Sequence, residues 1–104
     1  MIVTVTPNPS VDRTLEVDVL ARGEVVRVQG ARMHAGGKGV NVSRALRRNG
    51  EPTTAVLPVG GAGGGRLSML LAEQGVAAVM VPIAAATRDN ITIAEADGVT
   101  TKLN

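Results

Sequence analysis

Several residue types are missing from this sequence of 104 residues, and each absence excludes a class of site. There is no cysteine, which rules out disulfides and thiolate metal ligands. There is no Phe, Tyr or Trp, so the aromatic stacking platforms that bind single-stranded nucleic acids cannot form. The single histidine, His34, cannot build a histidine metal cluster, and we expect it to be structural. We therefore expect neither a metal site nor a nucleic-acid partner.

The sequence also has no large excess of one charge over the other and no long hydrophobic run. Eleven basic residues oppose nine acidic ones, and the longest basic run, Arg47-Arg48, fits a solvated helix face. The start of the chain, Met1 to Thr6, has no basic region and no long apolar stretch, so we expect no signal peptide, no membrane span and a cytoplasmic location. The remaining composition is 44% hydrophobic, which suits one small packed domain or part of a larger one.

The most distinctive stretch covers residues 35–43, Ala-Gly-Gly-Lys-Gly-Val-Asn-Val-Ser. Apolar residues then recur at helical spacing, which predicts a helix from about Gly39 to Asn49 with Gly50 just past its end. A glycine-rich turn that leads into a helix N-terminus offers unpaired N–H groups to an anion or to hydroxyls. Lys38 adds a charge suited to phosphate, and Asn41 adds a donor and an acceptor.

The same stretch also suits an ordinary strand-to-helix turn with Lys38 in solvent. Two common phosphate loops are excluded by spacing. Gly39 follows the lysine where a Walker A loop needs Ser or Thr, and Val42 stands where the dinucleotide fingerprint needs its third glycine.

The remaining pattern predicts an α/β fold. Three β-rich runs, Ile2–Thr6, Thr53–Val59 and Ala77–Val81, indicate buried strands. Helices between them give a parallel, right-handed βαβαβ unit. The second helix presents three leucines on one face, and the glycine run at 60–65 before it predicts a flexible connecting loop.

Two segments carry antiparallel signals. The first alternates over Thr14–Val19 and continues as short strands over 24–28 and 31–34. The second runs from residue 87 to 104 and contains Asp97-Gly98, a pair typical of a type I′ hairpin turn. We expect the two segments to form one small sheet beside the α/β core. Asp12 would then follow the first strand at its ligand-binding end, and Arg88 would lie at the junction of core and sheet.

Three segments occur together in this chain: 4–12 (Thr-Val-Thr-Pro-Asn-Pro-Ser-Val-Asp), 35–46, and 87–90 (Thr-Arg-Asp-Asn). In this order and spacing they resemble the N-terminal part of the PfkB, ribokinase-like carbohydrate kinases. Within the family the chain is most similar to the phosphosugar branch, which includes 1-phosphofructokinase and tagatose-6-phosphate kinase. The resemblance covers the whole chain.

The resemblance implies a Rossmann-like core over 1–12 and 35–84 with a β-sheet lid over 13–34 and 87–104. It implies phosphoryl transfer from ATP with Mg²⁺ to a sugar phosphate, first of all fructose 1-phosphate, giving fructose 1,6-bisphosphate. Full-length members often pair through their lids, so a homodimer is expected. The resemblance also assigns substrate-binding roles: Asp12 to sugar hydroxyls, Gly36, Gly37, Lys38 and Asn41 to the pocket lining, and Arg88 to the substrate phosphate.

The chain departs from the family in lacking a Gly-Ala-Gly-Asp segment, which supplies the catalytic base. The ATP site of the family also lies largely outside it. We therefore expect a fragment that binds substrate, is inactive alone and self-associates through uncovered surfaces. The alternatives are a sugar-phosphate-binding module without catalysis, a kinase for tagatose 6-phosphate or fructose 6-phosphate, and an unrelated small α/β protein.

Overall fold

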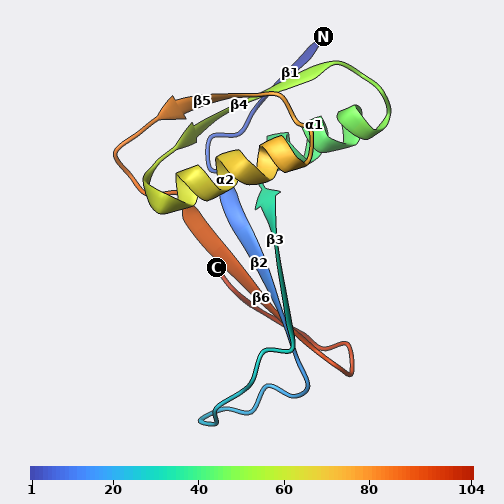
Figure 1. The fold of residues 1–104 in the computed structure, drawn as a ribbon, viewed down its shortest axis with the longest axis vertical. Helices are drawn as coiled ribbons and strands as arrows, with labels where there is room; N and C mark the ends of the chain where they lie inside the picture. Colours follow the sequence, from blue (N-terminus) through green and yellow to red (C-terminus); the bar gives the residue numbers. More distant parts are fainter.

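The computed structural model describes residues 1–104 as two sheets and two helices (Figure 1). The first sheet is parallel, with strand order β1-β4-β5. Its strands are β1 (Ile2–Val5), β4 (Thr53–Val59) and β5 (Ala78–Pro82). Helix α1 (Lys38–Arg48) precedes β4, and helix α2 (Gly61–Glu73) connects β4 to β5. The expected parallel βαβαβ unit is confirmed, with its first crossover enlarged by two further strands.

Both helices pack on one face of this sheet. Right-handed crossovers that advance in one direction along a sheet place their helices on the same side. Along β4, fully buried Ala55 and Leu57 alternate with half-buried neighbours. They belong to one apolar core to which α1 contributes Val40 and α2 contributes three leucines. The core contains no aromatic side chain, so closely packed aliphatic groups alone provide its apolar burial.

The opposite face of the parallel sheet is open in this chain. Val3, Val5, Val79 and Val81 are each about half exposed or more, with Val5 at 65%. The expectation that β1 and β5 are buried strands is therefore wrong for this face. Alternation along a strand buries only the residues that point toward the helices, and no other element of this chain covers the far side.

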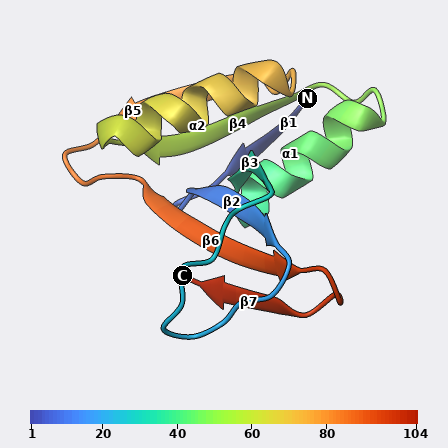
Figure 2. The ribbon, with the colours of Figure 1, turned by 60° about the horizontal axis from the view of Figure 1, so that its bottom comes forward.

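The second sheet has the strand order β3-β2-β6-β7 and projects from the first as an extended arm (Figure 2). Its strands are β2 (Ser10–Val17), β3 (Gly30–Gly36), β6 (Arg88–Glu95) and β7 (Thr100–Leu103). β2 pairs antiparallel with β3 and parallel with β6, and β6 pairs antiparallel with β7. The early and late antiparallel segments thus join into one sheet, as expected.

Two local predictions in this sheet are wrong. Residues 24–28 form no strand, because the segment from 18 to 29 is a long loop that has no pairing partner and leaves Val25 90% exposed. The turn at Asp97-Gly98 is not type I′, because only Gly98 has a positive φ, of 94°. The Gly98 N–H donates to Glu95 O and the Glu95 N–H donates to Val99 O, which describes a three-residue hairpin loop.

The second glycine run is helical rather than a flexible loop. Residues 61–65 form the first turns of α2. The segment that follows β5 crosses directly over them: a methyl group at Gly60 would lie 2.7 Å from Ile83 O, and one at Gly63 would lie 2.7 Å from Thr87 O. Thr87 also accepts the Gly60 N–H at its hydroxyl. Glycine is required here because two backbones approach closely, and tertiary contact outweighs its low helix propensity.

Candidate functional site

The glycine turn at 36–39 sits on the carboxyl end of β1. Gly37 is the N-cap of α1, with φ 127° and ψ 147°, a conformation that is essentially restricted to glycine. A methyl group at Gly37 would lie 2.5 Å from Thr6 Cγ2, and one at Gly39 would lie 2.8 Å from Val5 O. The sequence GGKG therefore brings the first turn of α1 into close contact with the end of the strand.

The N-terminus of α1 is open. No side chain caps it, and its first turn holds no acidic residue. Its free N–H groups and the positive end of the helix dipole adjoin a pocket of about 370 Å³, lined by Thr6, Pro7, Gly37, Lys38 and Arg88 among others. Thr6 is only 3% exposed, and its hydroxyl has no hydrogen-bond partner. The arrangement suits a phosphate-like anion.

Lys38 and Arg88 approach this pocket from different parts of the chain. Lys38 is the first residue of α1 and is exposed. Arg88 is the first residue of β6, where strand pairing places it next to Ser10, and its guanidinium donates to Asn8 O at 3.3 Å. The fold thus brings together two cations that are 50 residues apart, which is what a multiply charged ligand requires.

Asn41 lies one turn into α1 and is exposed, but its side chain already has a partner. Its Oδ1 accepts a hydrogen bond from Arg44, which also donates to Ala35 O at 3.0 and 3.1 Å. Arg44 therefore ties the end of β3 to α1 on both sides of the glycine turn. Sequence reasoning did not single out Arg44, although its place three residues after Asn41 on a helix could have indicated the contact.

Asp12 lies within β2 rather than in a loop after β1. Strand pairing aligns it with His34 of β3 and Asn90 of β6, on a polar face of the second sheet. This face lines a cleft of about 270 Å³ that contains no hydrophobic residue: Asp12, Thr14, His34, Asn90, Thr92, Lys102 and Asn104. Gly36, the last residue of β3, is buried beside Asp12. The cleft offers donors and acceptors of the kind that sugar hydroxyls need.

A buried chain of hydroxyl groups fixes α1 on the sheet. Ser43 of α1, fully buried, shares a hydrogen bond of 2.6 Å with Thr4 of β1 and one of 2.9 Å with Thr53 of β4. Hydrogen bonds between buried groups hold one geometry, because breaking them leaves polar atoms away from water. The position of the helix N-terminus is thereby set by contacts one turn below it.

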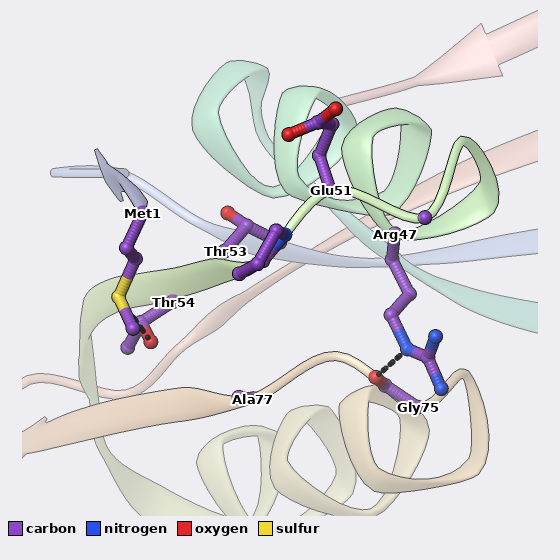
Figure 3. Close-up of a pocket in the computed structure, with 9 residues that line it drawn as sticks. Met1, Arg47, Glu51, Thr53, Thr54, Gly75 and Ala77 are labelled. Atoms are coloured by element: carbon purple, nitrogen blue, oxygen red, sulfur yellow. Dashed lines mark hydrogen bonds between the residues drawn. The ribbon is translucent and has the colours of Figure 1, made fainter.

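A third hollow, of about 390 Å³, lies at the other end of the parallel sheet (Figure 3). It is lined by Met1, Arg47, Glu51, Thr53 and Gly75 among others. Arg47 Nε donates to Gly75 O at 2.9 Å, which joins two of the residues that line the hollow. Helix C-termini meet here, so the dipoles disfavour an anion, and none of the residues expected to bind substrate lies in this region.

The structure places five of the six expected site residues in two groups, and Asn41 lies in neither. Gly37, Lys38 and Arg88 line the pocket at the helix N-terminus, while Asp12 lines the adjacent polar cleft with Gly36 packed behind it. Asn41 lies on α1 and contacts Arg44. Nowhere in the chain do three His, Asp or Glu side chains gather where they could hold a metal ion. Neither helix is long and apolar enough to cross a bilayer.

Comparison with known proteins identifies the family. Residues 5–104 match the pfkB family carbohydrate kinase. Over 94 residues, the chain is 42% identical to ATP-dependent 6-phosphofructokinase isozyme 2 of Mycobacterium tuberculosis, covering 90% of this chain and 28% of that protein. Over 99 residues it is 41% identical to 1-phosphofructokinase of Haloferax volcanii, covering 94% and 32% respectively.

Solved structures agree. Phosphofructokinase-2 from Escherichia coli, in complex with substrates and products, superposes with a TM-score of 0.92 at 32% identity, covering 99% of this chain and 34% of that one. The same enzyme has also been solved as a tetrameric inhibited form. The chain thus spans about a third of the length of the relatives it matches. The resemblance drawn from three short segments is confirmed, and the chain belongs to the pfkB family of carbohydrate kinases.

Proposed function

We propose that this chain forms the sugar-phosphate-binding part of an ATP-dependent kinase. The observation that carries the proposal is the pocket where an uncapped helix N-terminus, Lys38 and Arg88 meet beside the polar cleft of Asp12. The pocket would hold the phosphate group and the cleft would hold the sugar hydroxyls. The site combines cationic and hydroxyl-binding groups, which is the chemistry that a phosphorylated sugar presents.

Fructose 1-phosphate, converted to fructose 1,6-bisphosphate, is our first candidate for the reaction. It is supported by the relatives named 1-phosphofructokinase and by the lysine within the glycine turn. Fructose 6-phosphate is the second candidate, favoured by the 42% identity to a 6-phosphofructokinase. Tagatose 6-phosphate remains an outcome that the binding experiment below can reveal, and a sugar-phosphate-binding module without catalysis remains the alternative to a kinase.

The chemical step requires groups that this chain does not contain. We propose that the catalytic base and most of the ATP site belong to the other two thirds of a full-length kinase. Mg²⁺ does not fit a site made of this chain's residues alone, because no carboxylate cluster is present. The 104-residue chain alone is accordingly expected to transfer no phosphate from ATP to fructose 1-phosphate. Use of ATP also agrees with a cytoplasmic location.

The test is calorimetric titration of the chain with fructose 1-phosphate, fructose 6-phosphate and tagatose 6-phosphate. Lys38→Ala should weaken binding of the preferred ligand about tenfold, since it removes a charge-assisted contact to phosphate. Arg48→Ala is the matched control: it removes the same charge from the other end of α1 and should leave binding unchanged. The proposal would be contradicted if the unchanged chain and both variants bound all three sugar phosphates equally well, or if a chain that circular dichroism shows to be folded bound none of them.

We also propose that the second sheet acts as a lid and pairs with a second copy through its outer face. Apolar side chains gather on that face, opposite the polar cleft: Leu15, Met33, Ile91, Ile93 and Leu103. The tetrameric form of the E. coli relative supports an oligomeric family member. Sedimentation equilibrium should show dimers that Ile93→Glu disrupts. If instead only Val81→Glu, on the open face of the parallel sheet, restores monomers, the lid is not the interface.

A further inference from the structure

The Asp12 carboxylate is held by two donors from one side. Ser10 Oγ donates to Asp12 Oδ1 at 2.7 Å, and Asn90 Nδ2 donates to the same oxygen at 3.2 Å. Asn90 Nδ2 also donates to Ser10 Oγ at 3.3 Å, which closes a triangle of three side chains. Strand pairing explains the triangle, because Asn90 of β6 lies directly across from Asp12 of β2 and all three residues share one face.

The other carboxylate oxygen is left free. No hydrogen bond within the chain goes to Asp12 Oδ2, whereas Oδ1 receives two. Gly36 backs this arrangement on β3: a methyl group there would overlap Asp12 Oδ2 and lie 2.6 Å from Ser10 Oγ. The carboxylate therefore lies between residues of β2, β3 and β6, with Oδ1 hydrogen-bonded and Oδ2 without a partner in the chain.

The orientation of the Asn90 amide favours contact with Asp12 at the expense of its own hydrogen bonding. An ionised carboxylate only accepts hydrogen bonds, so the Asn90 amide must turn its NH₂ group toward Asp12. Its Oδ1 then faces away, where it is buried and has no partner. Leaving a buried acceptor unpaired is unfavourable, and a buried polar atom without a partner calls for an explanation such as function. A side chain kept for the fold alone would not carry this penalty.

We propose that Asn90, together with Ser10, is a positioning residue that fixes Asp12 so that Oδ2 accepts a hydroxyl of the sugar. The inference rests on the proposed function and adds to it a residue that acts on the substrate only through Asp12. Binding of the sugar should then depend on Asn90, while binding of the phosphate group alone should not. The orphaned Oδ1 predicts further that removing the amide costs the fold little.

The experiment compares Asn90→Ala, Asn90→Asp and the unchanged chain by calorimetry with fructose 1-phosphate, fructose 6-phosphate and inorganic phosphate. Asn90→Ala should weaken the preferred sugar phosphate roughly tenfold, leave inorganic phosphate unchanged and shift the melting temperature little. Asp89→Ala is the matched control, since Asp89 adjoins Asn90 on β6 but points to the opposite face, where it pairs with Arg13. It should bind the sugar phosphate as the unchanged chain does.

Asn90→Asp gives a readout that a structural role would not produce. It places a second carboxyl group beside Asp12. Because two neighbouring carboxylates repel each other, the pKa at which the second of the two groups ionises is raised. At neutral pH the variant should bind poorly. As the pH falls and the pair takes up a proton, the introduced group can donate to Asp12 Oδ1, and binding should recover. His34 and Lys102 line the same cleft, and Arg88 lies beside Ser10, but all variants share them, so affinities are compared as ratios to the unchanged chain.

A second measurement is independent of any ligand. NMR couplings about the Cα–Cβ bond of Asp12 should report one rotamer in the unchanged chain and averaging in Asn90→Ala. If Asp12 stays fixed in that variant, or sugar-phosphate affinity does not change, the positioning role is overturned and the proposed function stands. If the unchanged chain binds no sugar phosphate while Asp12 loses its fixed rotamer in the variant, the proposed function fails and the positioning of Asp12 by Asn90 is retained.

Discussion

The helix termini at the two ends of the parallel sheet differ in how their backbone groups are satisfied. At the amino end of the sheet, the C-termini of both helices are closed by hydrogen bonds within the chain. After α1, Gly50 takes φ 76° and the Glu51 N–H donates to Leu46 O; after α2, Gly75 takes φ 69° and the Val76 N–H donates to Leu71 O. These are Schellman closures, which satisfy the last carbonyl groups with the chain's own amides. At the carboxyl end, neither α1 nor α2 has a side-chain cap.

This difference shows where the chain leaves binding capacity unused. Both ends contain glycines with positive φ and a nearby cation, Lys38 at one end and Arg47 at the other. Both cations line a hollow, but Arg47 donates to the Gly75 carbonyl there, whereas the Lys38 side chain makes no hydrogen bond within the chain. Glycine and a basic residue therefore do not identify a site by themselves. The candidate site lies at the end where donors remain without partners.

The largest expected effect compares glycines at the two ends. Gly37→Ala should lower the free energy of unfolding by about 3 to 5 kcal/mol, because the conformation is closed to alanine and the methyl group would strike Thr6. Gly50→Ala should cost only about 1 to 2 kcal/mol, because the φ of 76° is strained but the space around it is open. Urea unfolding measures both, and equal losses would show that close packing at the carboxyl end is not what demands glycine.

A smaller effect is expected in the hydroxyl chain that joins α1 to the sheet. Ser43→Ala should cost about 1 to 3 kcal/mol, because Thr4 and Thr53 would each lose a buried partner. Ser68→Ala, in α2, makes no such contact and should change stability by less than about 0.5 kcal/mol. Thermal unfolding of the two variants checks this. A neutral Ser43→Ala would mean that the aliphatic core alone seats the helix.

The smallest effect concerns the cation at the amino end. Arg47→Ala removes one exposed hydrogen bond to Gly75 O and should cost about 1 kcal/mol or less. Sugar-phosphate affinity should stay unchanged, in contrast to the loss expected for Lys38→Ala. Calorimetry and urea unfolding of both variants separate the two roles. A loss of affinity in Arg47→Ala would indicate that the ligand binds at the amino end of the sheet, and it would contradict the difference drawn between the two ends.

Periodicity and capping signals predicted the local elements well. The helix expected from about Gly39 to Asn49 is observed over Lys38–Arg48, and the strand expected at Thr53–Val59 is observed with those bounds. The late hairpin is also confirmed. These elements are set by neighbours within a few residues, so a local pattern contains enough information to locate them.

Errors arose where distant segments decide the outcome. The run at 60–65 has the composition of a loop, yet residues 61–65 are helical because the chain after β5 packs against this run and glycine leaves room for it. The strand expected at 24–28 has suitable residues but no partner strand. Burial of β1 and β5 was overestimated because a sequence shows which strands are apolar, not which of their faces are covered.

Short segments with fixed spacing were enough to identify the family, the parallel βαβαβ order and the residues expected to bind substrate, because such segments are read from neighbouring positions in the chain. Three contacts could be seen only in the folded chain: Asn90 donates to Asp12, Arg44 joins the two sides of the glycine turn, and Lys38 and Arg88 line one pocket. The physical reason is that strand register and crossover geometry bring together residues separated by as many as 80 positions, and no local pattern records which of them will meet.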